Sequence, residues 1–422
     1  MDSSARRSVW TLIGVQTLCL LGSEIARFGV SVWIYQTTHS VSAFSALLLA
    51  NTVPGMVAAP FAGSIVDRSS RKRVMIGAAI VSLCGTLIVL SGAALGTLSM
   101  TFVIAGAALA SIGDSFQWPA LSATVPLMAS DEDLPRYNGF LESGRAVSAL
   151  AGPAIGGFLF AILGLTGLVS VELVTFVLAT SVVAVMRIPR PTVTVPEAEQ
   201  LSLIEDSTSG IRWILRHRPL FKFLLVATFA NFIISIGMVL MSPYALSFLG
   251  ERGFGIANGL FGAGMIAGGL AYSLLARWFK SSPLFLGTAL LLGGVYVAYG
   301  FSRGVASLGA LNLVMAMIMT IGNAAIMTIW QVKVPDELQG RVLSTMRLVA
   351  DITLPISFVL AGPLTDRVAP WVFARTHGAA VWGSSPSAVM GAMFSAMGVL
   401  LAIGFALAFA VREIRDVEDI PV

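Results

Sequence analysis

The sequence predicts an all-α membrane protein with about twelve transmembrane helices, built as two similar six-helix halves. Only 11% of its 422 residues are charged, whereas about 25% are charged in soluble domains. The apolar residues form long runs, and roughly 20 of them in a helix cross the ~30 Å hydrocarbon core of a bilayer. Several residue pairs also recur at one constant offset, which indicates that the halves are repeats.

Twelve segments are long and apolar enough to form these helices. We place them at 9–36, 42–66, 74–95, 99–126, 138–164, 167–187, 219–248, 254–276, 283–301, 305–333, 341–366 and 385–411. The first is too long and irregular for a cleaved signal, so we expect it to be retained. Cys19 and Cys84 lie inside spans and predict no disulfide framework.

The loop charges predict an orientation. With a cytoplasmic N-terminus, 19 of the 26 lysines and arginines lie in cytoplasmic segments and four in outer loops. Positive residues are enriched on the cytoplasmic side of a membrane, so we expect both termini in the cytoplasm. The net charge of +4 fits basic loops that face anionic lipid, and we expect no nucleic-acid partner.

The longest polar break, 188–218, divides the chain into six spans and six spans. We therefore expect an N-terminal bundle at 1–187, a cytoplasmic linker at 188–218 and a C-terminal bundle at 219–422. The second part of the linker has helical spacing, with one apolar and one basic face, formed by Leu203, Ile204, Ile211, Ile214 and Leu215 opposite Arg212 and Arg216. It predicts an amphipathic helix on the membrane surface, or alternatively a site for a regulatory partner.

Matching residues in the two halves are 209 positions apart. The pairs are Tyr35 and Tyr244, Gly55 and Gly264, Met56 and Met265, Arg68 and Arg277, Gly113 and Gly322, and Val125-Pro126 and Val334-Pro335. Parallel six-helix repeats form a transporter architecture in which substrate binds near the midplane, between the halves.

The loop after the second span carries a glycine, an Asp-Arg pair and a basic cluster: Gly63, Asp67, Arg68, Arg71, Lys72 and Arg73. It resembles the signature loop of the major facilitator superfamily, although Ser70 stands where many members have glycine. The resemblance implies that the loop steadies one conformation of the transport cycle. Its arginines could pair with carboxylates or lipid phosphates. The alternative is an ordinary basic cytoplasmic loop.

The fifth span carries small residues and a proline at Gly139, Ser148, Gly152, Pro153, Gly156 and Gly157. This pattern resembles the glycine-proline motif of antiporters in the same superfamily, with Ser148 where glycine is usual. Small residues permit close helix contact, and the proline removes a backbone donor.

Longer stretches resemble bacterial exporters of the macrolide-efflux and enterobactin type. They are 22–42, 117–126, 187–191, 329–342 and 361–368, and the IWQVKVPDELQGR sequence is the most specific. The resemblance implies the superfamily fold, a bacterial inner-membrane location, and export of drugs or siderophores. The basic residue that many drug antiporters have in the fourth span is absent from 99–113, which argues against a proton relay of their kind.

Ionisable side chains inside spans cost at least ~2.5 kcal/mol each on insertion scales, so they are functional candidates. They are Glu24, Arg27, Asp114, Glu142, Arg145, Glu172, Arg347 and Asp351. Glu24, Asp114 and Asp351 are the proton-coupling candidates. Glu172 is discounted, because it is expected only about one turn inside the outer interface.

Three of these charge pairs have helical spacing. Glu24 and Arg27 share a face, and their pairing predicts either proton coupling at Glu24 or a structural ion pair. Two further pairs are formed by Glu142 with Arg145 and by Arg347 with Asp351, at equivalent places in the two halves. We interpret these as gating ion pairs, and alternatively as direct ligands of substrate or protons.

Polar and aromatic residues within the spans predict a cavity for a bulky amphipathic molecule. The candidates are Phe28, Phe116, Asn231, Phe232, Asn323, Trp330 and Gln331. The chain has no nucleotide-binding, metal-ligating or nucleophile motif, so we expect no enzyme activity, no cofactor and no ATPase domain.

The sequence therefore predicts a monomeric secondary transporter that exports amphipathic drugs in exchange for protons and contacts membrane lipids. A dedicated exporter of one metabolite, such as a siderophore or self-made antibiotic, is the main alternative. An importer and a non-transporting membrane sensor are less favoured alternatives, because fold alone does not fix function.

Overall fold

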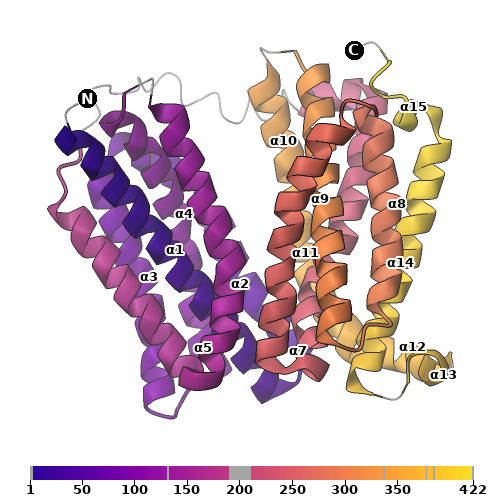
Figure 1. The fold of residues 1–422 in the computed structure, drawn as a ribbon, viewed down its shortest axis with the longest axis horizontal. Coiled ribbons are helices and arrows are strands. Elements are labelled where there is room, and N and C mark those ends of the chain that lie inside the picture. The colour runs from indigo at the N-terminus through magenta and orange to yellow at the C-terminus, as the bar shows by residue number, and fades with distance from the viewer. Residues whose placement is uncertain are drawn as a thin grey trace. The chain divides into compact units, whose positions relative to one another are not determined.

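The computed structural model describes residues 3–130, 133–189, 211–335, 338–376, 378–383 and 385–420. Within these ranges every regular element is a helix. The chain divides into two compact units, Met1–Pro196 with Glu251–Gly255, and Glu197–Gly250 with Ile256–Val422. Each unit is a bundle of long helices (Figure 1).

The first unit contains five helical elements: α1 (Ser3–Thr38), α2 (Val41–Arg68), α3 (Arg71–Ala94), α4 (Met100–Met128) and α5 (Leu134–Val185). The α1 helix packs along α5, and α4 packs against both α2 and α3. This arrangement brings residues of α1, α3, α4 and α5 together in the interior of the bundle.

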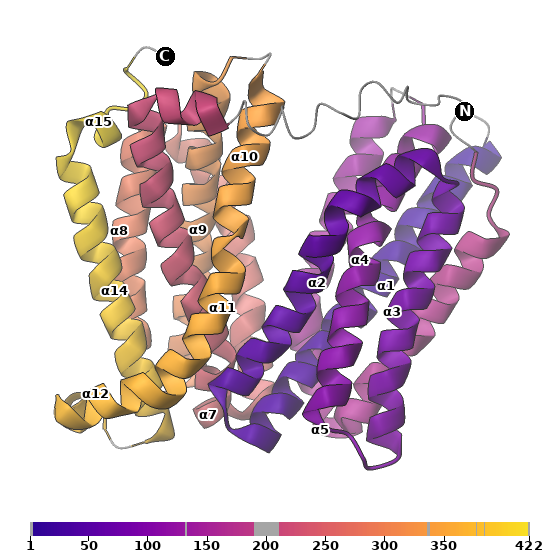
Figure 2. The ribbon, with the colours of Figure 1, turned by 180° about the vertical axis from the view of Figure 1, so that it is seen from behind.

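The second unit includes four long helices, α7 (Arg218–Leu275), α8 (Ser281–Tyr299), α9 (Val305–Lys333) and α14 (Pro386–Ala410). The α8 helix packs against both α9 and α14. Short helices α12 (Ala369–Arg375) and α13 (Gly378–Trp382) contact one end of α14, and α15 (Arg412–Arg415) follows its other end (Figures 1 and 2).

Ten described helices are long and apolar enough to cross a membrane. Two of them, α5 and α7, are 52 and 58 residues long, about twice the length that a bilayer requires. Each contains one glycine with positive φ and non-helical geometry, Gly164 in α5 and Gly250 in α7. Both glycines lie at or between the span boundaries predicted from sequence. The predicted fold class is confirmed, and reading these two helices as four spans gives the predicted count of twelve.

The predicted eleventh span, 341–366, is a nearly continuous helix with a local irregularity. It consists of α10 (Gln339–Asp351), α11 (Thr353–Pro363) and the π-helical turn η3 (Leu364–Val368), which leads into α12. The irregularity falls at Ile352, which keeps right-handed helical backbone angles and still donates to the carbonyl of Leu348. Proline lacks the backbone donor and crowds the carbonyl four residues earlier, so Pro355 explains an irregularity close to Asp351.

Most of the predicted linker lies outside the described residues, including Leu203 and Ile204. Its last part, 211–216, is helical. Ile214 is buried there, while Ile211 and Leu215 are exposed. The described turn therefore has exposed apolar side chains, and its interpretation as a membrane-surface helix stays a prediction.

Small residues set the distance between α1 and α5. A Cβ atom at Gly152 would collide with the Cβ of Glu24, and one at Gly156 would lie 3.1 Å from the ring of Phe28. The Ser148 hydroxyl donates to the carbonyl of Thr17 at 3.2 Å. The small residues of the fifth span thus allow α5 to lie directly against α1 at Glu24 and Phe28.

Candidate functional site

A cluster of charged side chains joins α1 to α4. The guanidinium of Arg27 donates from Nη1 to Glu24 Oε1 at 2.7 Å and from Nη2 to Asp114 Oδ2 at 3.0 Å. Sequence spacing predicted the first contact. The second joins residues 87 positions apart and follows from the packing of the bundle.

The cluster faces open space. The side chains of Arg27 and Asp114 are 42% and 44% exposed, and that of Glu24 is 28% exposed. All three positions lie within apolar helices that are long enough to span a bilayer. Charged groups at such positions require water, because exposure to lipid would cost several kcal/mol, at least ~2.5 each. We therefore interpret the exposed side of this cluster as hydrated.

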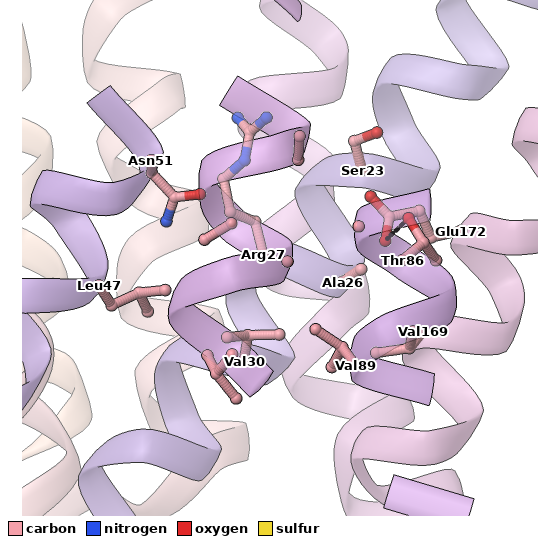
Figure 3. Close-up of a pocket in the computed structure, with 15 residues that line it drawn as sticks. Ser23, Ala26, Arg27, Val30, Leu47, Asn51, Thr86, Val89, Val169 and Glu172 are labelled. Carbon is pink, nitrogen blue, oxygen red and sulfur yellow. Dashed lines mark hydrogen bonds between the residues drawn. The ribbon is translucent and has the colours of Figure 1, made fainter. Parts of the chain in front are cut away.

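Arg27 also lines a small cavity of about 50 Å³ inside the first unit. Its polar lining includes Ser23 and Arg27 of α1, Asn51 of α2, Thr86 of α3 and Glu172 of α5 (Figure 3). The remainder is mainly apolar. Glu172 lies beside Thr86, apart from the guanidinium of Arg27 (Figure 3).

Glu172 was left out of the predicted site, because the sequence places it near the outer interface. The structure places its carboxylate within the cavity lining, 3.2 Å from the hydroxyl of Thr86. One signal could have identified it, since Glu172 is the only ionisable residue between Arg145 and Arg187. Its place beside Thr86 depends on contact between α3 and α5, which spacing does not reveal.

The predicted pair in the fifth span is not formed within the described residues. No ion pair joins Glu142 to Arg145; the guanidinium of Arg145 instead lies 4.9 Å from the ring centre of Trp118. Helical spacing permits an ion pair without requiring one, and a nearby aromatic face attracts the same cation.

The basic loop bonds to helix ends. Arg71 donates to the carbonyl of Ala123 at 2.8 Å, and Lys72 donates to the carbonyl of Met186 at 2.8 Å. These carbonyls lie near the C-terminal ends of α4 and α5, where positive charge is favoured. The carboxylate or lipid partners that we expected are replaced, for these two residues, by backbone carbonyls.

The other motif residues fall at several places. Gly63, Asp67 and Arg68 belong to the final turns of α2, and their side chains lie outside the described set. Arg73 lines a groove between α2, α3 and α4 together with Phe116, so Phe116 is apart from the Arg27 cavity.

The remaining residues of the glycine-proline motif lie on α5. Gly139 has open space where a Cβ would stand, and Pro153 lies within the helix. Gly157 follows Gly156 on the same helix.

A second cavity, of about 720 Å³, lies in the second unit. Five predicted residues contribute to its lining, namely Asn231, Asn323, Trp330, Arg347 and Asp351. Two buried polar atoms of the lining, Thr228 Oγ1 and Trp330 Nε1, have no hydrogen-bond partner among the described contacts. A mainly apolar cavity with few polar groups suits an amphipathic ligand.

The charged and amide groups of this cavity differ in their contacts. Arg347 Nε lies 3.6 Å from Asp351 Oδ2, one turn along the same helix. Asn231 donates to Ala350 O and to Thr353 Oγ1, both at 2.8 Å. Asn231 therefore joins α7 to the junction between α10 and α11.

Besides Phe116, three of the predicted cavity residues line neither cavity. Phe28 is buried against α5. Phe232 offers its carbonyl to Ser357. The Gln331 side chain is exposed, and its carbonyl accepts a hydrogen bond from Gln339. Among the described residues, no group of three histidine, cysteine or carboxylate side chains could hold a metal ion.

Comparison with known proteins gives matches that cover most of the chain. The family model for the Major Facilitator Superfamily matches residues 12–357. Macrolide efflux protein A of Streptococcus pyogenes is 25% identical over 85% of this chain and 89% of its own length. The multidrug efflux pump Tap of Mycolicibacterium fortuitum is 25% identical over 78% of this chain and 82% of its own length.

Solved structures share the fold. A bacterial homologue of the lysosomal transporter Spinster, inward-facing and unoccupied, has a TM-score of 0.71 at 13% identity and covers 99% of both chains. A bacterial homologue of the iron transporter ferroportin, also inward-facing, has a TM-score of 0.71 at 18% identity and covers 96% of this chain and 99% of its own.

Proposed function

The chain belongs to the major facilitator superfamily and is a multi-pass membrane transporter, not an enzyme; on that premise, we propose that it exports amphipathic, drug-like compounds in exchange for protons. The names of its relatives, macrolide efflux protein and multidrug efflux pump, support export and this substrate class. We propose alternating access as the mechanism.

The observation that carries the coupling proposal is the Glu24–Arg27–Asp114 cluster. One guanidinium bonds two carboxylates, so the three groups carry one uncompensated negative charge when both acids are ionised. A proton on Glu24 or Asp114 removes that charge and weakens one contact of Arg27. Because Arg27 joins α1 to α4, protonation at this cluster changes how strongly the two helices are held together.

The second cavity supports the substrate class. Its lining is mainly apolar, and its polar groups are few and separated, as expected for a site that accepts amphipathic molecules of differing shape. We propose that Asn323 contacts the substrate there, and that Arg347 and Asp351 respond to its presence. The proposal also includes a bacterial inner-membrane location, cytoplasmic termini, a monomer, and energy from the proton gradient without a bound cofactor.

Everted membrane vesicles test this function. Uptake of a fluorescent amphipathic drug should depend on the proton gradient, and an ionophore that collapses the gradient should stop it. Asp114→Asn should reduce the initial rate at least ~10-fold, which corresponds to about 1.4 kcal/mol. Glu413→Gln is the control, because Glu413 pairs only with exposed Lys222 in the described contacts. Uptake that survives collapse of the gradient contradicts proton coupling.

A further inference from the structure

The connection between the last two spans differs between the two units. In the first unit the fifth and sixth spans meet at one non-helical residue, Gly164, within α5. In the second unit the helices α12 and α13 lie between the eleventh and twelfth spans. None of the described residues of α12 and α13 lines either of the two cavities. The second unit therefore carries an additional helical segment that the candidate site does not use.

The helix that leads into α12 is longer than a bilayer requires. The apolar segment Thr345–Arg375 contains 31 residues, whereas roughly 20 residues cross the hydrocarbon core. The α12 helix runs across the end of the bundle instead of continuing along α11 (Figures 1 and 2). The change of direction follows the π-helical turn η3. Because α12 follows directly from a membrane span and crosses its end, it lies at the level of the membrane surface.

One side of α12 packs against the protein. Residues four apart share a side of a helix, and Thr365 is buried while Ala369 and Phe373 are partly buried. These three residues form the side that faces the bundle. No residue within α12 itself is fully buried. Short helices are marginally stable in water without packing, so α12 requires a further apolar environment.

The two flanks of α12 differ in polarity. Val368 and Val372 are four residues apart on one flank and are 48% and 41% exposed. A step of two residues turns an α-helix by about 200°, so the other flank carries Asp366, Pro370 and Ala374, which are also exposed. One flank thus has two large apolar side chains, and the other has a carboxylate and only small or cyclic side chains.

Trp371 and Arg375 lie on the side that points away from the bundle. The side chain of Trp371 is 59% exposed, and the guanidinium carbon of Arg375 lies 3.8 Å from the centre of its ring. The described contacts give Arg375 no carboxylate partner. Tryptophan is enriched at membrane–water interfaces, and an arginine beside it can extend to the polar surface and bond lipid phosphate.

From this arrangement we infer that α12 is an interfacial helix that binds the phospholipid surface of the membrane. Val368, Trp371 and Val372 lie among the upper ends of the lipid chains. Arg375 bonds lipid phosphates, and the flank that carries Asp366 faces water. The helix thereby holds one end of α11 at the membrane surface, while α10 lines the second cavity at the other end of the same span. The inference requires only that the chain spans a membrane, so it is independent of proton coupling and substrate.

Spin labels on single cysteines test this orientation in liposomes of phosphatidylethanolamine and phosphatidylglycerol. Val372→Cys and Ala374→Cys carry the label on the two flanks of the full-length protein, in a Cys84→Ser background because Cys84 is exposed and Cys19 is buried. Oxygen concentrates in the hydrocarbon, whereas a nickel chelate stays in water. The ratio of oxygen to nickel collisions should be at least ~3-fold higher at position 372, since an interfacial helix buries its apolar side.

Two results would overturn the inference. Equal collision ratios at the two positions would show that both flanks have the same environment. A label at position 372 that neither reagent reaches would show that protein covers this flank, for example a second copy of the chain.

The fluorescence of Trp371 gives a second measurement without cysteine substitutions. The difference in emission between the wild type and Trp371→Phe reports this residue among the eight tryptophans. Phospholipids brominated near the upper ends of their chains should quench at least ~50% of that difference, because interfacial tryptophans lie at the headgroup level. Trp330→Phe is the matched control, since Trp330 is fully buried and its contribution should be quenched less. Absence of quenching at Trp371, or equal quenching of the two contributions, contradicts lipid binding by α12.

Discussion

At the predicted site of the first unit an ionic contact joins two helices, whereas at the cavity of the second unit a neutral amide does so. Arg27 of α1 bonds Asp114 of α4 at 3.0 Å. Asn231 of α7 bonds Ala350 and Thr353 beside the junction of α10 and α11. In the described contacts, Arg347 pairs with Asp351 on its own helix.

The contacts in the two units differ in how protonation affects them. Protonation of Asp114 removes the charge that Arg27 bonds and loosens a contact between helices. Protonation of Asp351 affects an exposed pair within one helical turn, and such pairs contribute about 0.3–0.5 kcal/mol. The amide of Asn231 does not titrate. We therefore expect the pH dependence of transport to come mainly from the first unit.

The largest effect is expected at the two arginines. Arg27→Gln should reduce proton-driven uptake at least ~10-fold, since both carboxylates lose their cation. Arg347→Gln should change the rate less than ~3-fold, because its pair is exposed and local. Initial rates in everted vesicles, normalised to the amount of protein, measure both. Equal losses of uptake rate in the two variants would contradict the proposed difference between the two units.

The close contact between Gly152 and Glu24 should not tolerate an added methyl group. Gly152→Ala places a Cβ against Glu24, and such overpacking costs about 1–3 kcal/mol. Gly14→Ala, on α1, is the matched control because a Cβ there meets open space. Thermal unfolding in detergent should show a lower midpoint for Gly152→Ala alone. If both variants unfold like the wild type, the close contact is not required.

The amide link in the second unit should contribute mainly to stability. Asn231→Ala removes two hydrogen bonds and should cost about 1–3 kcal/mol. The pH dependence of uptake should stay that of the wild type, because no titrating group is removed. A shifted pH profile would mean that the second unit takes part in coupling.

The smallest effect is expected at the C-terminal end. A hydrogen bond from Arg415 holds the pKa of Asp416 below its usual range. A lowered pKa stabilises the fold above the ordinary pKa of aspartate, and the contribution is lost as the pH falls through the lowered value. Unfolding midpoints should drop slightly more for the wild type than for Asp416→Asn below about pH 4. Identical acid profiles would show that this contact contributes nothing measurable.

Local sequence patterns predicted much of the fold. Hydropathy runs placed the long helices, and Gly164 and Gly250 interrupt α5 and α7 where two spans were expected to meet. The local irregularity at Ile352 was not predicted, although Pro355 offered a signal. A proline inside a hydrophobic run distorts a helix by an amount that depends on the neighbouring helices.

The candidate site was predicted only where its contacts are local. Spacing of three residues placed Glu24 beside Arg27. The same spacing in Glu142 and Arg145 gave no ion pair among the described residues. The guanidinium of Arg145 lies over the ring of Trp118 of α4 instead. Contacts of Arg27 with Asp114, and of Glu172 with Thr86, join distant segments and depend on helix packing.

Substrate-driven proton movement tests the central claim most directly. Proteoliposomes that contain the purified protein and a trapped pH dye are given an outward or inward drug gradient without an initial pH difference. The account predicts proton flux opposite to the drug in the wild type, and none when Glu24→Gln and Asp114→Asn are combined. Undiminished proton flux in the double variant would contradict the assignment of coupling to the Arg27 cluster.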